Sequence, residues 1–293
     1  VLTVGRDRLD LRRQEPVERW LAEARPDAVI LAAATVGGIL ANDTRPADFL
    51  YDNIAIAQNV VEGARKAGVA KLLFLGSTCI YPRDAAVPTP ETALLTGPLE
   101  PTNEWYAIAK IAGLKMAAAY RRQYGFNAIS AMPTNLYGPG DKFHPDVSHV
   151  IPALIKKCVD AVDRREDRVV VWGTGNATRE FFYVEDAAEA IVLAAERYDK
   201  SDPVNIGPGF EISIRDLVTL IAELTAFRGR IEWDATQPDG QLAFVVRLIA
   251  AQGQRHVVQR RVELVPEPGI VAEGHLQPGR TSANIPLDGH ALA

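Results

Sequence analysis

The chain has 293 residues, 47% of them hydrophobic, which is enough for one large domain or two closely packed domains around a full core. Its formal net charge is -5 and no basic run occurs, which excludes an electrostatic surface for nucleic acid or an anionic membrane. The two cysteines are too few for a disulfide framework and lack metal-ligand spacing, so we expect a reducing cytoplasm and no bound metal. No window approaches the ~20 apolar residues of a membrane-spanning helix.

The first half of the chain alternates apolar strands with helices. Strands are expected at 27–34, 71–76 and 127–132, and helices at 46–68 and 103–125. The strands are nearly continuous apolar runs, which is the pattern of strands buried on both faces of a parallel sheet. This order predicts an α/β fold with a Rossmann-like, doubly wound parallel sheet.

After residue 149 the alternation becomes less regular. The expected elements are a helix at 150–162, strands at 168–172 and 180–183, a helix at 186–198, a strand at 204–206, and a helix capped by Ser213 and Asp216. This part is predicted to be a smaller α/β substrate lobe. We therefore expect a Rossmann-like domain at 1–146, an interleaved lobe at 147–241, and a divergent tail at 242–293 whose end is disordered.

The amino-terminal sequence lacks the glycine-rich turn that normally follows the first strand of a dinucleotide-binding fold. We therefore expect the first βα unit to be absent and residues 1–5 to be the remainder of a second strand. The missing strand would be central in this fold, and its loss would leave backbone groups of two neighbouring strands unpaired. On this ground the sequence is interpreted as a fragment or a mis-started reading frame.

Tyr106 and Lys110 lie four residues apart on a predicted helix and therefore share one of its faces. A lysine ammonium about 4 Å from the phenol oxygen is worth roughly 4 kcal/mol at an effective dielectric near 20, or about three pKa units. This predicts a Tyr106 pKa near neutrality and a proton donor tuned by Lys110. The same spacing occurs by chance in many helices, so the pair alone does not establish a site.

The strand before that helix ends in Ser77, Thr78 and Cys79. A strand-end serine followed by tyrosine and lysine one connection later resembles the short-chain dehydrogenase/reductase superfamily, extended branch. Further segments narrow the resemblance to the GDP-L-fucose synthase family, over roughly residues 1–241. These segments are 73–82, 100–104, 106–113, 133–139 and 148–154, in this order.

The resemblance implies an NADP(H)-dependent enzyme that acts on a GDP-sugar. The implied reaction is epimerisation of GDP-4-keto-6-deoxymannose at carbons 3 and 5, followed by reduction of the ketone at carbon 4. It also implies a homodimer formed through the helix at 103–125. A plain nucleotide-sugar epimerase or dehydratase of the same superfamily, and a non-catalytic truncated remnant, are the alternatives.

The catalytic residues implied by the resemblance are Ser77, Cys79, Tyr106, Lys110 and His149. Ser77 would bind the ketone oxygen, Tyr106 would supply its proton, and Lys110 would hold Tyr106 and the nicotinamide ribose. Cys79, with a lowered thiol pKa, and His149 would move protons beside the ketone. Cys79 could instead be a buried inert residue and His149 a surface or cap residue. Cys158 is expected to have no catalytic role, as are the other histidines, His144, His256, His275 and His290.

The cofactor site implied by the resemblance spans the ends of several strands. Arg6 would hold the 2′-phosphate of NADP(H), although the adjacent Asp7 is the residue type that favours NAD. The remaining cofactor residues are Asp10, Leu11, Ala32, Ala33, Leu75, Gly76, Ser77, Thr78, Lys110, Pro133, Thr134, Asn135, Leu136 and His149.

Three residues of the predicted lobe resemble contacts to the GDP moiety. Lys157 and Arg179 would bind its diphosphate, and Trp172 would stack on guanine. Each also has an ordinary structural alternative: a solvated helix lysine, a surface arginine and a core tryptophan.

Overall fold

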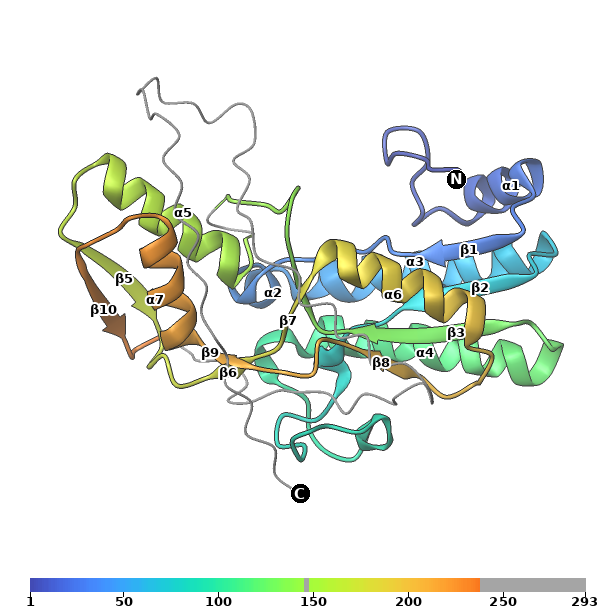
Figure 1. Ribbon diagram of the computed structural model, residues 1–293. Helices are drawn as coiled ribbons and strands as arrows, with labels where there is room; N and C mark the ends of the chain where they lie inside the picture. The colour runs from blue at the N-terminus through green and yellow to red at the C-terminus, as the bar shows by residue number, and fades with distance from the viewer. Residues whose placement is uncertain (145–147, 238–293) are drawn as a thin grey trace. The chain divides into compact units, whose positions relative to one another are not determined.

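A computed structural model describes residues 1–144 and 148–237 (Figure 1). The predicted tail at 242–293 and both ends of the predicted lobe lie outside the described residues. No helix within the described ranges is long and apolar enough to cross a membrane.

The main sheet has four parallel strands in the order β1-β2-β3-β8. These strands are β1 (Ala28–Leu31), β2 (Lys71–Leu75), β3 (Ala128–Pro133) and β8 (Val204–Ile206). Each lies within three residues of its predicted ends. β8 comes late in the chain, so the backbone returns to this sheet after leaving it at β3.

Helices cover both faces of the main sheet (Figure 1). They are α1 (Gln14–Ala24), packed on α3 (Pro46–Lys66), and α4 (Glu104–Tyr124) on one side, and α6 (Val184–Arg197) on the other. Leu72 and Phe74 of β2 point into the core beneath α3 and α4, whereas Leu73 and Leu75 point into the core beneath α6. This period-two alternation, apolar on both faces, confirms the predicted doubly wound fold.

Helix α4, which carries Tyr106 and Lys110, packs unusually close to β2. A Cβ on Gly113 would lie 2.3 Å from the Phe74 ring, and that ring is almost fully buried. Only glycine therefore fits at this crossing. The helix ends at Gly125, whose φ of 65° lies in the left-handed region that favours glycine.

A second core forms around α5 (Val150–Asp163) and α7 (Ile214–Leu224). It is bounded by the parallel pair β5 (Arg168–Trp172) and β10 (Arg230–Asp234). The Ser213 hydroxyl accepts a hydrogen bond from the Asp216 amide at 3.0 Å, which confirms the predicted cap of α7.

Short elements connect the two cores. β4 (Asn135–Tyr137) pairs with β7 (Phe181–Tyr183) in parallel, and β6 (Thr178–Arg179) pairs with β9 (Ile212–Ser213) in antiparallel orientation. The remaining elements are α2 (Ile39–Thr44), η1 (Thr78–Ile80), η2 (Glu91–Ala93) and η3 (Pro101–Asn103). The sequence did not predict β4, β6, β9 or β10. β4, β6 and β9 have only two or three residues, and none of the four missed strands is a continuous apolar run like β2.

The prediction that residues 1–5 form a strand is wrong. They form no strand, and the Gly5 carbonyl instead accepts turn hydrogen bonds from the amides of Arg8 and Leu9, both at 3.0 Å. β1 is the edge strand of the described sheet and ends at Leu31. The next amide, that of Ala32, donates a hydrogen bond to the Ile30 carbonyl at 3.2 Å. The described sheet offers this segment no strand partner, and its Gly5 carbonyl is satisfied by the turn at residues 6–8 instead.

Candidate active site

The site lies where three parallel strands end. Ala32 and Ala33 follow β1 and are exposed, Ser77 follows β2, and Asn135 and Leu136 follow β3 and are exposed. Carboxyl ends of parallel strands meet at one edge of a sheet, which is where ligands bind in open α/β folds. The predicted cofactor residues of these three segments therefore share one edge.

Backbone geometry constrains the end of β2. Leu75 and Gly76 are buried, and a Cβ on Gly76 would lie 2.3 Å from the Met132 sulfur. Thr134, which follows β3, is also buried, and its hydroxyl has no hydrogen-bond partner among the described residues. Glycine at 76 thus allows β2 and β3 to pack closely just before their carboxyl ends open onto the site.

Tyr106 and Lys110 are held together inside the protein. The Lys110 ammonium donates to the Leu75 carbonyl at 2.8 Å and lies 5.6 Å from the centre of the Tyr106 ring. Phe49 of α3 packs edge-on against Tyr106, with ring centres 6.5 Å apart. The lysine is therefore oriented by the end of β2, and the tyrosine by the neighbouring helix.

The prediction of a lowered Tyr106 pKa is wrong for this structure. Burial raises the pKa of the Tyr106 phenol, and a Cys79 thiolate would raise it further. Burial also lowers the pKa of Lys110 to about 8, against a smaller opposing effect of Cys79. A lowered Tyr106 pKa would require a fully charged lysine in a moderate dielectric, whereas loss of hydration disfavours both the phenolate and the ammonium.

Cys79 is half-buried and lies close to this pair, since a thiolate there would act electrostatically on both Tyr106 and Lys110. The Ser77 hydroxyl caps η1 by accepting from the Cys79 amide at 3.4 Å. Burial raises the pKa of the Cys79 thiol to about 11, although Ser77 and Lys110 lower it slightly. The predicted lowering is therefore wrong, and the thiol is protonated at neutral pH.

His149 is the N-cap residue of α5, but its imidazole makes no capping hydrogen bond. His149 is exposed as a residue, but neighbouring atoms partly desolvate it, which lowers its pKa from the usual 6.5. The charge of Asp141 opposes this shift and that of Lys142 adds to it. The preceding Ser148 is fixed against Gly38, where a Cβ would lie 2.7 Å from the Ser148 carbonyl. Gly38 leads into α2, which packs on η3 just before the Tyr106 helix. Convergence of His149 with Cys79 remains a prediction.

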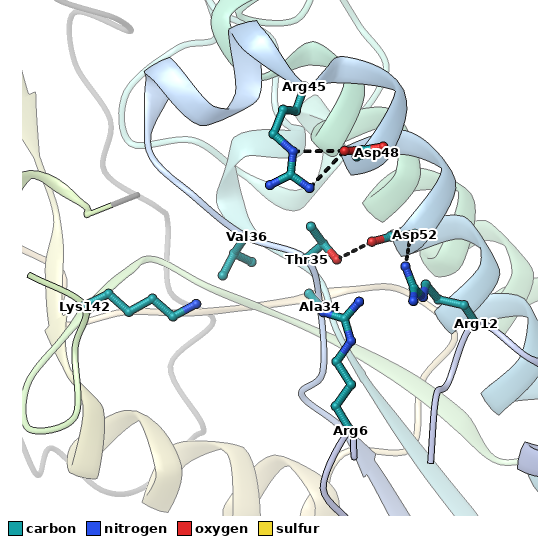
Figure 2. Close-up of a pocket in the computed structure, with 9 residues that line it drawn as sticks. All are labelled: Arg6, Arg12, Ala34, Thr35, Val36, Arg45, Asp48, Asp52 and Lys142. Atoms are coloured by element: carbon teal, nitrogen blue, oxygen red, sulfur yellow. Dashed lines mark hydrogen bonds and ion pairs between the residues drawn. The ribbon is translucent and has the colours of Figure 1, made fainter. Parts of the chain in front are cut away.

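A cavity of about 320 Å³ lies beside the end of β1 (Figure 2). Its lining is strongly charged and comprises Arg6, Arg12, Ala34, Thr35, Val36, Arg45, Asp48, Asp52 and Lys142. The Thr35 hydroxyl donates to Asp52 at 2.9 Å, and Arg12 donates to the other Asp52 oxygen at 3.1 Å. These bonds fix the loop after β1 against α3.

Of the predicted adenosine-end residues, only Arg6 lines this cavity. Asp10 instead forms an ion pair with Arg12 at 2.8 Å, which keeps the pKa of its carboxyl group well below the usual range. Leu11 packs against the main core. The other charged lining residues were not predicted from the sequence. One available signal was the set of three polar residues, Asp52, Asn53 and Asn59, on the mainly apolar buried face of α3.

The predicted substrate residues lie on α5, β5 and β6. The Lys157 ammonium donates to the Val170 carbonyl at 2.9 Å and lies 5.9 Å from the Trp172 ring, which is 46% exposed. Arg179 donates to the Thr178 carbonyl at 2.7 Å. Trp172 is therefore a surface residue and not part of a core, and the Lys157 ammonium lies beside its ring.

Residues 3–207 match the NAD dependent epimerase/dehydratase family. The chain is 56% identical over 240 residues to the GDP-L-fucose synthase of Sinorhizobium fredii, covering 82% of this chain and 76% of that protein. It is also 56% identical to GDP-L-fucose synthase 1 of Arabidopsis thaliana, with 79% and 72% covered. The chain belongs to the GDP-L-fucose synthases of this family.

A solved structure supports the same assignment. The GDP-L-fucose synthetase of Naegleria fowleri, determined with NADP bound, superposes with a TM-score of 0.75 at 28% identity. The match covers 84% of this chain and 76% of that one. The fold of a GDP-L-fucose synthase is therefore present here, with Tyr106, Lys110, Ser77 and Cys79 at the carboxyl edge of its main sheet.

Proposed function

We propose that this protein converts GDP-4-keto-6-deoxy-D-mannose into GDP-L-fucose. It would first epimerise the sugar at carbons 3 and 5 and then reduce the ketone at carbon 4 with NADPH. The observation that carries this proposal is the group formed by Cys79, Tyr106 and Lys110 in a chain of the GDP-L-fucose synthase family. Of these three residues, reduction alone would need only Tyr106 and Lys110. Epimerisation also needs groups that exchange protons at the carbons beside the ketone, which is the role of Cys79.

The described residues fit NADP(H) as cofactor. Exposed alanines at 32 and 33 leave room at the end of β1, and the cationic cavity beside them suits phosphate groups. The Thr134 hydroxyl, which has no hydrogen-bond partner within residues 1–144 and 148–237, follows β3, where the nicotinamide would pass. When bound, NADPH supplies the hydride, and the protein supplies position and protons.

Epimerisation would use Cys79 and His149 as a proton donor and acceptor. At neutral pH the raised pKa keeps the thiol protonated, while the lowered pKa keeps the imidazole neutral. The Cys79 thiol thus has a proton to donate, and the neutral His149 imidazole has a lone pair that can accept one. Protons at carbons 3 and 5 become acidic because both positions adjoin the ketone, which stabilises the enolate.

Reduction would follow in the same pocket. Tyr106 must be protonated to donate to the forming alkoxide, and its raised pKa ensures this. Ser77 would stabilise the developing oxyanion, and Lys110, fixed by the Leu75 carbonyl, would position Tyr106 and the ribose. On the other side, Lys157 and Arg179 would bind the GDP diphosphate and Trp172 would stack on guanine.

The direct test is conversion of GDP-4-keto-6-deoxy-D-mannose with NADPH, followed by absorbance and by chromatography of the product. We expect GDP-L-fucose and one NADPH consumed per sugar. Turnover without NADPH consumption would instead favour the plain epimerase or dehydratase. Absence of both turnover and saturable NADPH binding would favour the non-catalytic remnant.

Exchange of the carbon 3 and carbon 5 protons with solvent is expected to slow at acidic pH. His149 acts here as the unprotonated base, so protonation removes its lone pair. Because partial desolvation lowers its pKa below the usual 6.5, the loss should occur only below that pH. Deuterium exchange followed by NMR between about pH 5 and 8 measures this profile. An unchanged profile in His149→Gln, or an altered one in the control His144→Gln, would contradict the assignment.

We also propose a homodimer formed through α3 and α4. Tyr51 on α3 and Trp105 and Ile108 on α4 are 64%, 43% and 37% exposed, although they are large and apolar. Trp105→Glu combined with Ile108→Glu should give the mass of one chain in analytical ultracentrifugation, against two for the wild type. Val192→Glu on α6, another exposed apolar position, is the control and should remain dimeric.

A cytoplasmic location is supported by the two free cysteines, because Cys79 must stay reduced to act as the proposed proton donor. Cell fractionation tests this, and recovery with secreted proteins would contradict it.

A further inference from the structure

We propose that Glu180 is a positioning residue for the GDP-sugar. Its buried carboxyl group anchors the loop at 207–211 and thereby fixes the orientation of the adjacent Arg179. This inference rests on the proposed function, in which Arg179 binds the diphosphate of the substrate. Glu180 lies between β6, which ends at Arg179, and β7, which begins at Phe181.

The side chain of Glu180 is completely buried. Its exposed fraction is 0%, which places it among the largest fully buried side chains of the described residues. Glutamate is rarely buried to this degree unless its carboxyl group has hydrogen-bond partners, because loss of hydration is costly. One carboxyl oxygen accepts a hydrogen bond from the Gly209 amide at 2.6 Å. This bond attaches the loop at 207–211 to the buried side chain.

The loop at 207–211 packs tightly around this carboxyl group. A Cβ on Gly207 would lie 2.5 Å from the Glu180 Oε1 atom and 3.0 Å from its Cδ atom. The donor, Gly209, has a φ of 79°, in the left-handed region that favours glycine. The loop conformation and the position of the Glu180 carboxyl group therefore depend on each other.

The same loop connects the main sheet to the strand that pairs with Arg179. It joins β8, a strand of the main sheet, to β9, in which Ile212 is the register partner of Arg179. Figure 1 shows β6 and β9 side by side between α7 and β8. Side chains alternate in extended backbone, so the inward position of Glu180 directs Arg179, which is only partly buried, to the other side.

The backbone of Glu180 has a separate contact. Its carbonyl accepts hydrogen bonds from the main-chain amide of Asn135 at 3.3 Å and from the Asn135 side-chain amide at 3.1 Å. Asn135 is a proposed cofactor residue, and any residue at position 180 keeps this carbonyl. A change of side chain should therefore weaken binding of the GDP-sugar and leave binding of NADPH near the wild-type level.

The test combines steady-state kinetics on the GDP-keto sugar with calorimetric titration of GDP and fluorescence titration of NADPH. In Glu180→Ala, KM for the sugar should rise and GDP binding should weaken, both about tenfold, as expected for loss of one oriented charge-assisted contact. The kcat at saturation and the NADPH affinity should stay within about threefold of wild type. Simple loss of folded protein would instead lower kcat and leave KM unchanged.

Two further variants examine the hydrogen bond itself. Glu180→Gln keeps an oxygen that can accept from the Gly209 amide, so it should retain most of the GDP affinity. Gly207→Ala keeps Glu180 but places a methyl group against its carboxyl oxygen, so it should weaken GDP binding. If Glu180→Ala is not recovered as folded protein, Gly207→Ala carries the same test.

Glu91→Ala is the matched control. The Glu91 carboxyl group also accepts a backbone hydrogen bond next to this loop, from the Asn205 amide of β8 at 3.0 Å. Glu91 belongs to η2, however, and is not connected to Arg179 through a paired strand. Its loss should leave the sugar KM and the GDP affinity unchanged.

Three results would overturn the inference. Lower kcat with unchanged KM and GDP affinity in Glu180→Ala and Gly207→Ala would mean that Glu180 only stabilises the fold. Equal losses of GDP affinity in Glu91→Ala and Glu180→Ala would mean that the effect is not specific to Glu180. Equal losses in Glu180→Gln and Glu180→Ala would exclude the hydrogen bond to Gly209 as its cause. If the wild-type chain binds GDP but forms no GDP-L-fucose, the proposed function fails, and the GDP titrations still test Glu180.

Discussion

Tyr106→Phe is expected to lower kcat for reduction of the carbon 4 ketone about 100- to 10,000-fold, the usual contribution of a positioned proton donor. The ring would stay in place, because its edge-on contact with Phe49 does not involve the hydroxyl. Only the proton for the forming alkoxide is lost. Exchange at carbons 3 and 5 should continue, since it depends on Cys79 and His149. Stopped-flow NADPH oxidation and NMR exchange measure the two steps separately.

Tyr120→Phe is the matched control for this prediction. It removes a phenol oxygen from the same helix at a position that contacts Glu62 and not the strand ends. Its kcat should stay within about twofold of wild type, as is usual for substitutions away from reacting groups. If Tyr106→Phe reduced the ketone at the wild-type rate, the proton would have to come from another group.

Cys79→Ser is expected to abolish most solvent exchange at carbons 3 and 5, by about 100-fold or more. Serine keeps the size and the hydrogen-bonding pattern at η1, but its hydroxyl is a far weaker acid than a thiol. Reduction should persist when the already epimerised keto sugar is supplied, because Tyr106 and Lys110 are unchanged. NMR exchange in deuterated solvent and NADPH consumption provide the two measurements.

Cys158→Ser is the natural control, since the chain contains two free cysteines in different settings. Cys158 is fully buried in the core around α5 and α7, away from the strand ends. Its replacement should cost about 1–3 kcal/mol of stability by burying a hydroxyl, yet leave exchange intact. Normal exchange in Cys79→Ser would instead favour a plain epimerase or dehydratase.

The main fold was predictable because its signals are local. Continuous apolar runs at β2 and β3 identify strands buried on both faces, and Gly125 and Ser213 mark helix ends through their own backbone chemistry. Several short elements were missed. β10 alternates polar and apolar residues, but over five positions only, and its register is set by parallel pairing with β5.

Candidate site residues were predictable as types, but their electrostatics were not. The Tyr106–Lys110 spacing indicates that the two share a helix face. It does not reveal that Lys110 is buried at the end of β2 or that Tyr106 is half-buried against Phe49 of α3. Burial reversed the direction of the Tyr106 and Cys79 pKa shifts. Desolvation depends on every neighbour within several ångströms, and most of those neighbours are distant in the chain.

The sequence by itself determined the alternating α/β order, the serine, cysteine, tyrosine and lysine of the site, and the family they indicate. Those features depend on residue spacing within single elements. Tertiary structure alone decided which charges meet: Arg12 with Asp52, and Lys142 across a cavity from Arg6. It also decided that residues 1–5 form no strand and lead into a turn at residues 6–8. The physical reason is that strand pairing, burial and charge contact are long-range, and no local pattern encodes the partner.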